Sequence, residues 1–176
     1  MNGNCHVLFG AAVGSALAIN VDKINSILPN INVSAETATI FVLGGILGGI
    51  FPDIDSPQSY VGKLTHPISR TIGKISKYFG KTKEMHRGIF HDPTIYLALL
   101  ALSYFYFPPV IGFLLGCLSH LYLDLFNAAG IPIFLGARRI HIACIESGKK
   151  TARIFTRVHS LVAVIAGLVA KFAFVI

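Results

Sequence analysis

The chain has 176 residues, of which 53% are hydrophobic and only 13% are charged. Its mean hydropathy of +0.67 is too high for an ordinary soluble domain. This composition excludes a disordered chain, a collagen-like chain and a disulfide scaffold. The length fits one domain over residues 1–176, and a net charge of +7 with so much apolar sequence points to a membrane rather than to nucleic acid.

Five apolar segments follow one another along the chain and are too long for strands, so we expect helices. They cover residues 6–20, 38–51, 94–107, 110–126 and 158–176. The predicted fold is therefore all-α, a polytopic membrane bundle of about five helices. Only the last segment reaches the roughly 20 residues that cross a bilayer comfortably. The others must extend into polar flanks such as 34–37, or insert only partly.

Basic residues are concentrated in two of the connecting segments. Residues 52–93 and 127–157 hold thirteen of the fifteen Lys and Arg residues. With five spans, both segments lie on the same side as the N-terminus, and the positive-inside rule places that side in the cytoplasm. We therefore expect a multi-pass protein of the inner membrane with an external C-terminus. Anionic lipid headgroups are the expected partner of this charge, and no nucleic acid is expected.

The first basic segment contains an amphipathic pattern. Apolar residues recur there at spacings of three or four, and basic residues fall between them: Val61, Leu64, Ile68, Ile72, Ile75 and Phe79 alternate with Lys63, Arg70, Lys74 and Lys77. This predicts a basic amphipathic helix. Two interpretations remain open, a helix in the membrane interface and a helix packed on the end of the bundle.

Three predicted helices carry glycines spaced by four that lead to an ionisable residue. Gly10 and Gly14 follow His6, Gly45 and Gly49 precede Asp53, and Gly112 and Gly116 precede His120 and Asp124. Residues four apart share a helix face, and small residues let membrane helices approach closely. The pattern therefore predicts that these helices pack together and bring His6, Asp53, His120 and Asp124 into one place.

Seven ionisable residues fall at the cytoplasmic ends of the predicted helices. They are His6, Asp53, Asp55, His86, His91, His120 and Asp124. Such residues in a membrane protein are costly and usually functional. Imidazole with carboxylate suits a divalent transition metal, zinc first and manganese or iron next, better than magnesium. One or two ions fit this number of ligands. The alternative is that His120 and Asp124 only bond to each other in a buried polar seam.

Four blocks in order resemble a known family. They are His6-Val7-Leu8-Phe9-Gly10, then Gly49-Ile50-Phe51-Pro52-Asp53-Ile54-Asp55-Ser56-Pro57, then His86-Arg87-Gly88-Ile89-Phe90-His91, then Ser119-His120-Leu121-Tyr122-Leu123-Asp124. The chain up to Glu146 resembles the YdjM-like family of membrane-bound metal-dependent hydrolases. The resemblance implies a helical membrane protein whose His and Asp residues bind metal. A more remote similarity to zinc-dependent phospholipase C suggests a phosphoester substrate.

The chain departs from the family where the third block usually ends in Thr-His-Ser, since Phe90-His91-Asp92 stand there. We expect Asp92 to cap the helix that starts at Pro93, the alternative being an extra ligand. Asp55, or else Asp53, is a candidate general base, and Arg87 is a candidate to hold a phosphate oxygen. Arg138 and Arg139 are candidates for the same substrate contact or for positive-inside anchoring.

The predicted function is a metal-dependent hydrolase that acts on a phosphoester or lipid headgroup from the cytoplasmic face. The main alternative is a transporter or channel for metal ions or protons, since intramembrane His and Asp also build ion pathways. Against transport, the polar residues cluster at one side and the sequence shows no internal repeat. A third interpretation, an adaptor with a structural metal, leaves more ligands than a closed site needs.

Overall fold

The five predicted apolar segments all form helices in the computed structural model, which describes residues 3–27, 34–79, 87–106, 110–142 and 145–173. The helices are α1 (Gly3–Ile19), α2 (Val21–Ile27), α3 (Ala35–Ile50), α4 (Tyr60–Leu64), α5 (His66–Phe79), α6 (Pro93–Tyr106), α7 (Ile111–Leu125) and α8 (Lys150–Ala173), joined by the 3-10 turns η1 (Phe51–Asp55) and η2 (Ile89–His91). Strands β1 (Ile131–Ile133) and β2 (Arg138–Ile140) complete the described elements.

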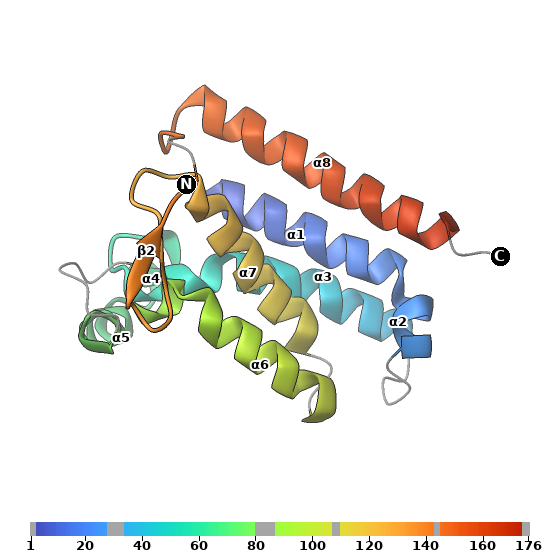
Figure 1. Ribbon diagram of the computed structural model, residues 1–176, viewed down its shortest axis with the longest axis horizontal. Coiled ribbons are helices and arrows are strands. Elements are labelled where there is room, and N and C mark those ends of the chain that lie inside the picture. Colours follow the sequence, from blue (N-terminus) through green and yellow to red (C-terminus); the bar gives the residue numbers. More distant parts are fainter. Residues whose placement is uncertain (1–2, 28–33, 80–86, 107–109, 143–144, 174–176) are drawn as a thin grey trace.

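The apolar helices alternate in direction along one bundle axis (Figure 1). α1, α6 and α8 start at the end of the bundle that carries the N-terminus, and α3 and α7 return to it. α1 is central, because it packs against α3, α7 and α8. As a result, the start of α1, the ends of α3 and α7 and the start of α6 meet at one end, as the sequence predicted.

Close approach of α1, α3 and α7 depends on the predicted glycines. A Cβ atom added at Gly49 would lie 2.6 Å from the His6 carbonyl oxygen, and one added at Gly112 would lie 2.8 Å from the Cα atom of Phe41. Gly10 and Gly116 both face the Gly45 carbonyl oxygen at distances that no side chain tolerates. The predicted packing of these three helices is therefore confirmed.

Replacing Gly48 with alanine should destabilise the α3–α7 contact. The new Cβ atom would lie 2.8 Å from the Cys117 backbone nitrogen, 2.9 Å from the Gly116 Cα atom and closer still to the Phe113 carbonyl oxygen. Backbone atoms cannot yield as a side chain can, so the helices must separate, at a cost of about 1–3 kcal/mol. Thermal unfolding of the detergent-solubilised protein measures the loss. Gly3→Ala, where no atom lies within 4 Å of the added Cβ, is the control and should unfold as the wild type does.

Two described stretches, Glu36–Asp55 and Lys150–Ala173, are helical, long and apolar enough to cross a membrane by length and composition. Gly3–Ile19, Pro93–Ser103 and Ile111–Leu125 are shorter apolar helices. α3 does extend into its predicted polar flank, where Ser34 caps it and exchanges hydrogen bonds with Thr37. Large apolar side chains of α3, α6 and α8 point outward, among them Leu47, Leu97 and Leu161.

α8 begins at Lys150, eight residues before the predicted start at Val158. The prediction began the helix at the first long apolar run, but Lys, Arg and Thr are all tolerated in helices. The added turns are amphipathic: Ala152 and Thr156 are buried, whereas Arg153 and Arg157 are exposed. Lys150, Arg153 and Arg157 therefore lie on the first turns of α8 and not in a loop.

The structure contains a hairpin of β1 and β2, which the predicted all-α fold did not include. Ile131 pairs with Ile140 and Ile133 with Arg138 in an antiparallel register. In its turn, Phe134 and Leu135 have positive φ values of 53° and 55°, and Gly136 follows with 80°. Phe and Leu are not residues that predict such a turn. Tertiary hydrogen bonds hold the turn, because the Phe134 amide donates to the Thr94 hydroxyl at 3.1 Å.

Candidate metal centre

Five of the seven predicted ligands come together at the end of the bundle. His6 lies in the first turns of α1, Asp53 in η1, His91 in η2, and His120 and Asp124 one turn apart on α7. Four of these side chains are at most 2% exposed, and Asp53 is the most accessible, with 18% of its side chain exposed. His86 lies outside the described residues.

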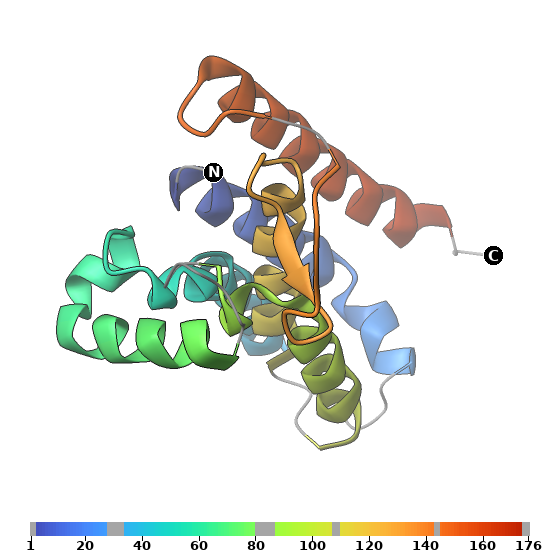
Figure 2. The same cartoon turned by 60° about the vertical axis from the view of Figure 1, so that its left-hand side comes forward.

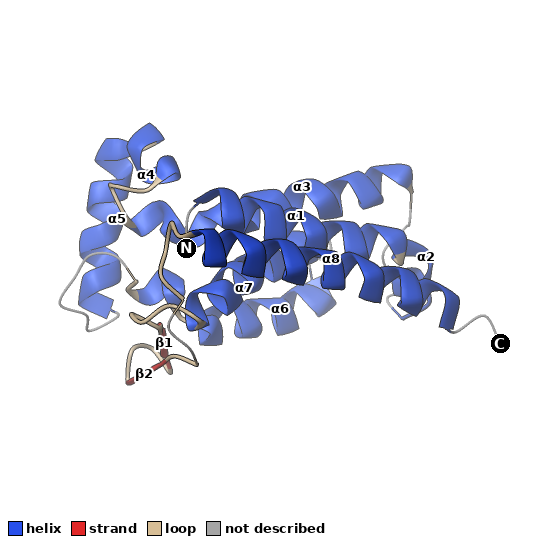
Figure 3. Ribbon diagram, turned by 90° about the horizontal axis from the view of Figure 1, so that it is seen from above, coloured by secondary structure: helices blue, strands red, loops and turns tan. Residues whose placement is uncertain are grey.

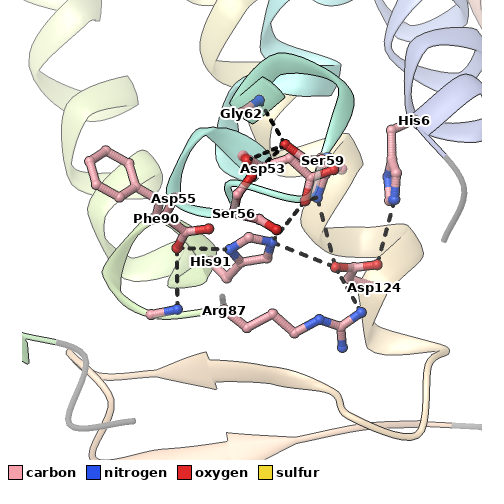
Figure 4. Close-up of polar contacts among 12 residues, drawn as sticks. His6, Asp53, Asp55, Ser56, Ser59, Gly62, Arg87, Phe90, His91 and Asp124 are labelled. Carbon is pink, nitrogen blue, oxygen red and sulfur yellow. Dashed lines mark hydrogen bonds and ion pairs between the residues drawn. The ribbon is translucent and has the colours of Figure 1, made fainter. Parts of the chain in front are cut away.

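Each residue reaches the centre through a local feature of its segment. Pro52 starts the η1 turn directly after α3, which places Asp53 at the end of the bundle. The Ser59 hydroxyl donates to the Asp53 carbonyl oxygen at 2.7 Å and fixes that turn. On α7, the spacing of four puts His120 and Asp124 on one helix face. Figure 4 shows how the Asp53, His91 and Asp124 side chains converge.

Two imidazole nitrogens and two carboxylate oxygens form the core of the cluster. His91 Nε2 lies 3.6 Å from Asp53 Oδ1 and 3.8 Å from Asp124 Oδ2, and His120 Nε2 lies 3.7 Å from each of the same two oxygens. Zinc–ligand bonds of about 2.0–2.2 Å place the ligands of a tetrahedral ion about 3.3–3.6 Å apart. The separations of 3.6–3.8 Å lie at or just above that range, and Asp53, His91 and His120 form one of two groups of three whose ligand atoms could hold a cation.

The protonation of His120 supports the same reading. Its Nδ1 lies 2.8 Å from the Gly49 carbonyl oxygen. A carbonyl only accepts, so Nδ1 carries a proton and Nε2 of the neutral ring presents a lone pair. This buried Nε2 makes no hydrogen bond within the described part of the chain. Two carboxylate oxygens repel a lone pair that faces them, and a cation bound between these groups would relieve that repulsion.

His6 belongs to the second group of three that could hold a metal ion, with His120 and Asp124. Its ring stacks on His120 with centroids 3.7 Å apart, and its Nε2 lies 3.6 Å from Asp124 Oδ1. Asp124 therefore faces His6 with Oδ1 and both His91 and His120 with Oδ2. The predicted proximity of His6 and His120 is confirmed.

Asp55 lies next to Nδ1 of His91, the ring nitrogen that faces away from Asp53 and Asp124. Asp55 Oδ2 lies 3.6 Å from His91 Nδ1 and accepts a hydrogen bond from the Ser76 hydroxyl at 2.7 Å. Burial disfavours a charged His91, but the carboxylates of Asp53 and Asp55 outweigh it and raise the pKa of His91 to about 9. His91 without metal therefore holds a proton at neutral pH, and a metal ion would replace that proton.

Replacing Asp55 with alanine should weaken metal binding about 10- to 100-fold without abolishing it, the usual cost of losing the partner of a ligating histidine. Titration against a chromophoric chelator measures the affinity. Ser69→Ala is the control, since Ser69 is also buried on α5. A complete loss of metal in Asp55→Ala would show that Asp55 is itself a ligand.

Arg87 contacts the same Asp124 oxygen that faces His91 and His120. Its Nη2 is 3.2 Å from Asp124 Oδ2, and its Nη1 donates to the Gly130 carbonyl oxygen at 2.9 Å. Arg87 has a positive φ of 62°, which costs a non-glycine residue about 1–3 kcal/mol. Arg139 supports this conformation, because its guanidinium donates to the Arg87 carbonyl oxygen at 3.2 Å and to that of Ala129 at 2.9 Å.

The remaining predicted residues lie outside the cluster. Arg138 is exposed on β2. Asp92 caps α6 as expected: one carboxylate oxygen accepts from the Thr94 amide at 2.9 Å and the other from the Gly136 amide at 3.1 Å. Ser76 was not among the predicted site residues. Its signal is weak, a run of small residues (Ser69, Gly73, Ser76) along an otherwise bulky helix.

A cavity of about 510 Å³ opens onto the cluster. Asp53, Asp124 and Arg87 line its inner side. The rest of the wall is a mixture of hydroxyl, amide and apolar groups: Gly3, Asn4, Val7, Ile50, Ser56, Gln58, Ser59, Tyr60 and Ser147. A ligand in this cavity would meet a guanidinium and the most accessible carboxylate together.

These features define a mostly helical protein with helices apolar enough to cross a membrane and a buried His/Asp cluster able to hold a metal ion at one end. The YdjM inner membrane protein family matches residues 1–175, and the chain belongs to that family. Inner membrane protein YdjM of Escherichia coli strain K12 is 32% identical over 123 residues, which cover 64% of this chain and 59% of the relative. The Shigella flexneri protein of the same name matches equally. The chain thus matches about three fifths of the length of these relatives. No solved structure matches it significantly.

Proposed function

We propose that this protein is a membrane-embedded, metal-dependent hydrolase that cleaves a phosphoester or lipid-headgroup bond at the cytoplasmic face. The observation that carries the proposal is the His120 Nε2 lone pair, buried 3.7 Å from two carboxylate oxygens. A metal cation bound there would relieve the repulsion between this lone pair and the carboxylates. The cavity beside it leaves one side of the cluster open, as catalytic metal sites do and closed structural sites do not.

The ligands we assign are His91, His120, Asp53 and Asp124, with His6 beside them. The two possible metal-binding groups, His6–His120–Asp124 and Asp53–His91–His120, share His120. Since His120 Nδ1 is bonded to Gly49, only Nε2 remains for a metal, and the two groups fit one ion better than two. Nitrogen and carboxylate ligands favour zinc, with manganese or iron as alternatives. When bound, such a metal polarises a phosphoryl oxygen and lowers the pKa of water.

The chain's own residues supply binding and proton transfer. Arg87 lines the cavity beside Asp124, so its guanidinium is placed to hold a phosphate oxygen. Asp53 is the accessible carboxylate of the cluster and lines the same cavity. Its Oδ1 faces the two histidines as a ligand would, so we assign the general base to its other oxygen, Oδ2. Asp55 is fully buried and holds His91, which suits a positioning role.

Transport of ions is a weaker explanation of the same cluster. A transport path requires polar groups through the whole bundle. Beyond the cluster, the contacts among α1, α3 and α7 are made by glycine backbone and by apolar side chains such as Phe41 and Leu114. Within the described residues, the His and Asp ligands gather at one end of the bundle only.

Metal analysis of the detergent-purified full chain, followed by a screen of phosphomonoesters, phosphodiesters and phospholipids, tests the proposal. We expect about one transition-metal ion per chain and turnover of at least one substrate that stops after chelation and returns with metal. A protein that holds no transition metal after mild purification would overturn the proposal. A protein that holds metal, turns over no substrate in the screen and moves the ion across vesicles would favour transport.

The five-span topology predicts that the metal centre lies in the cytoplasm. Reporter enzymes fused after Lys83 and after Ile176 should report opposite sides of the membrane, cytoplasmic for the first and external for the second. The charge bias of the two basic segments is the physical reason. Both reporters on one side would contradict five spans and favour helices that insert only partly.

A further inference from the structure

α5 presents three different faces to its surroundings. Successive residues of a helix are rotated by about 100°, which sorts the side chains of α5 into groups. Ser69, Gly73 and Ser76 are buried against the rest of the protein. Ile68 and Ile75 lie on a second face and are 58% and 49% exposed. Arg70, Lys74 and Lys77 form a third face, also exposed.

The buried face settles how α5 attaches to the protein. Small residues make the contacts to the site: the Ser76 hydroxyl donates to Asp55, and a Cβ atom added at Gly88 would collide with Ser76. Of the isoleucines of α5, Ile72 is half-buried, whereas Ile68 and Ile75 are exposed. The two interpretations of the sequence therefore both hold in part, because α5 packs on the end of the bundle and still leaves its apolar face without a partner in the described chain.

The orientation of α5 suits a membrane surface. α5 lies at the end of the bundle that carries the metal centre and runs across the direction of α1, α3, α6 and α8 (Figure 3). Figure 2 shows the same crossing from the side. If the bundle helices cross the bilayer, a helix perpendicular to them lies in the membrane plane, at the level where the bundle leaves the bilayer.

The charge of the segment identifies its partner. Residues 60–79 contain Lys63, Arg70, Lys74 and Lys77 and no Asp or Glu. Two further side chains extend this apolar surface. Leu64, at the end of α4, is 73% exposed, and Tyr78, near the end of α5, is 80% exposed. Apolar side chains beside a row of cations fit acyl chains beneath anionic headgroups, where each Lys or Arg contributes about 1 kcal/mol.

We propose that α4 and α5 form a docking surface for anionic lipid, with Ile68 and Ile75 in the upper acyl region and Arg70, Lys74 and Lys77 among the headgroup phosphates. The proposal rests on the membrane-crossing bundle and not on hydrolysis. Because Ser76 on the same helix holds Asp55, the docked helix also forms one wall of the metal centre.

A single tryptophan tests the proposal, since the chain has none. The full-length Ile75→Trp variant is placed, one chain per disc, in nanodiscs of phosphatidylcholine with and without phosphatidylglycerol. We expect a blue-shifted emission, quenched several-fold more by lipids brominated in the upper acyl chain when phosphatidylglycerol is present. Lys74→Gln with Lys77→Gln in this background should remove the dependence on phosphatidylglycerol. Lys77→Trp, on the basic face of the same helix, is the matched control and should be quenched less.

Leu168→Trp on α8 shows separately whether the bundle is in the bilayer. With Leu168→Trp quenched, a solvent-like and unquenched Ile75→Trp would overturn the proposal. Equal quenching in both lipid mixtures would overturn the anionic preference. A blue shift of Ile75→Trp that occurs only with two chains per disc would assign the apolar face to a second copy of the chain and overturn lipid docking.

Discussion

Replacing His120 with alanine should reduce the metal content of the purified protein from about one ion per chain to none. His120 Nε2 contributes to both groups that could hold an ion, so its loss leaves neither group complete. Asp124→Ala should have the same effect, because its two oxygens face His6 on one side and His91 and His120 on the other. Any metal-dependent turnover should fall to background in both variants.

Membrane insertion should survive these two changes. Insertion depends on the apolar segments, and removal of an ionisable group from a membrane helix eases it. Metal analysis and membrane fractionation of the same preparation measure both properties. Ser119→Ala is the matched control, since Ser119 is a buried neighbour on α7 whose hydroxyl donates to the Gly116 carbonyl oxygen of its own helix. A wild-type metal content in His120→Ala would contradict the assigned centre.

Replacing Arg87 with alanine should separate metal binding from turnover. A guanidinium is not a metal ligand, so the variant should still bind metal, with an affinity reduced about 10- to 100-fold because Asp124 loses an orienting partner. At saturating metal, turnover of an anionic substrate should fall by a further factor of about 10²–10³, the cost of one lost contact to developing charge. Metal titration and steady-state kinetics on the same variant measure the two effects.

Arg138→Ala is the control for charge at this end of the protein. Arg138 is exposed on β2, so its loss should change neither metal affinity nor turnover by more than a small factor. Complete loss of metal in Arg87→Ala would make Arg87 a structural support of the cluster and would contradict its assignment to substrate. Equal loss in Arg138→Ala would show that the measured effect is one of general charge.

Local sequence patterns predicted most of the helical fold because they report local physics. The glycines spaced by four predicted which helices pack together, since only a missing side chain permits the approach seen at Gly10 and Gly49. The hairpin was not predictable in this way. Its turn at Phe134 and Leu135 has no glycine before Gly136 and is held by Thr94 and Asp92, which are about forty residues away in the sequence.

The sequence by itself determined which helices meet and which end of the bundle gathers the His and Asp residues, because helix faces and helix directions follow from spacing and charge. Only the tertiary structure decided the role of each residue there. Asp53 and Asp55 are two positions apart in the η1 turn, yet one faces the open cluster and the other lies behind His91. Arg87 and Arg139 are likewise both basic, but one contacts Asp124 and the other holds backbone carbonyls. Such distinctions depend on where a turn points its side chains, and that is fixed by contacts with distant segments, as Ser76 fixes Asp55.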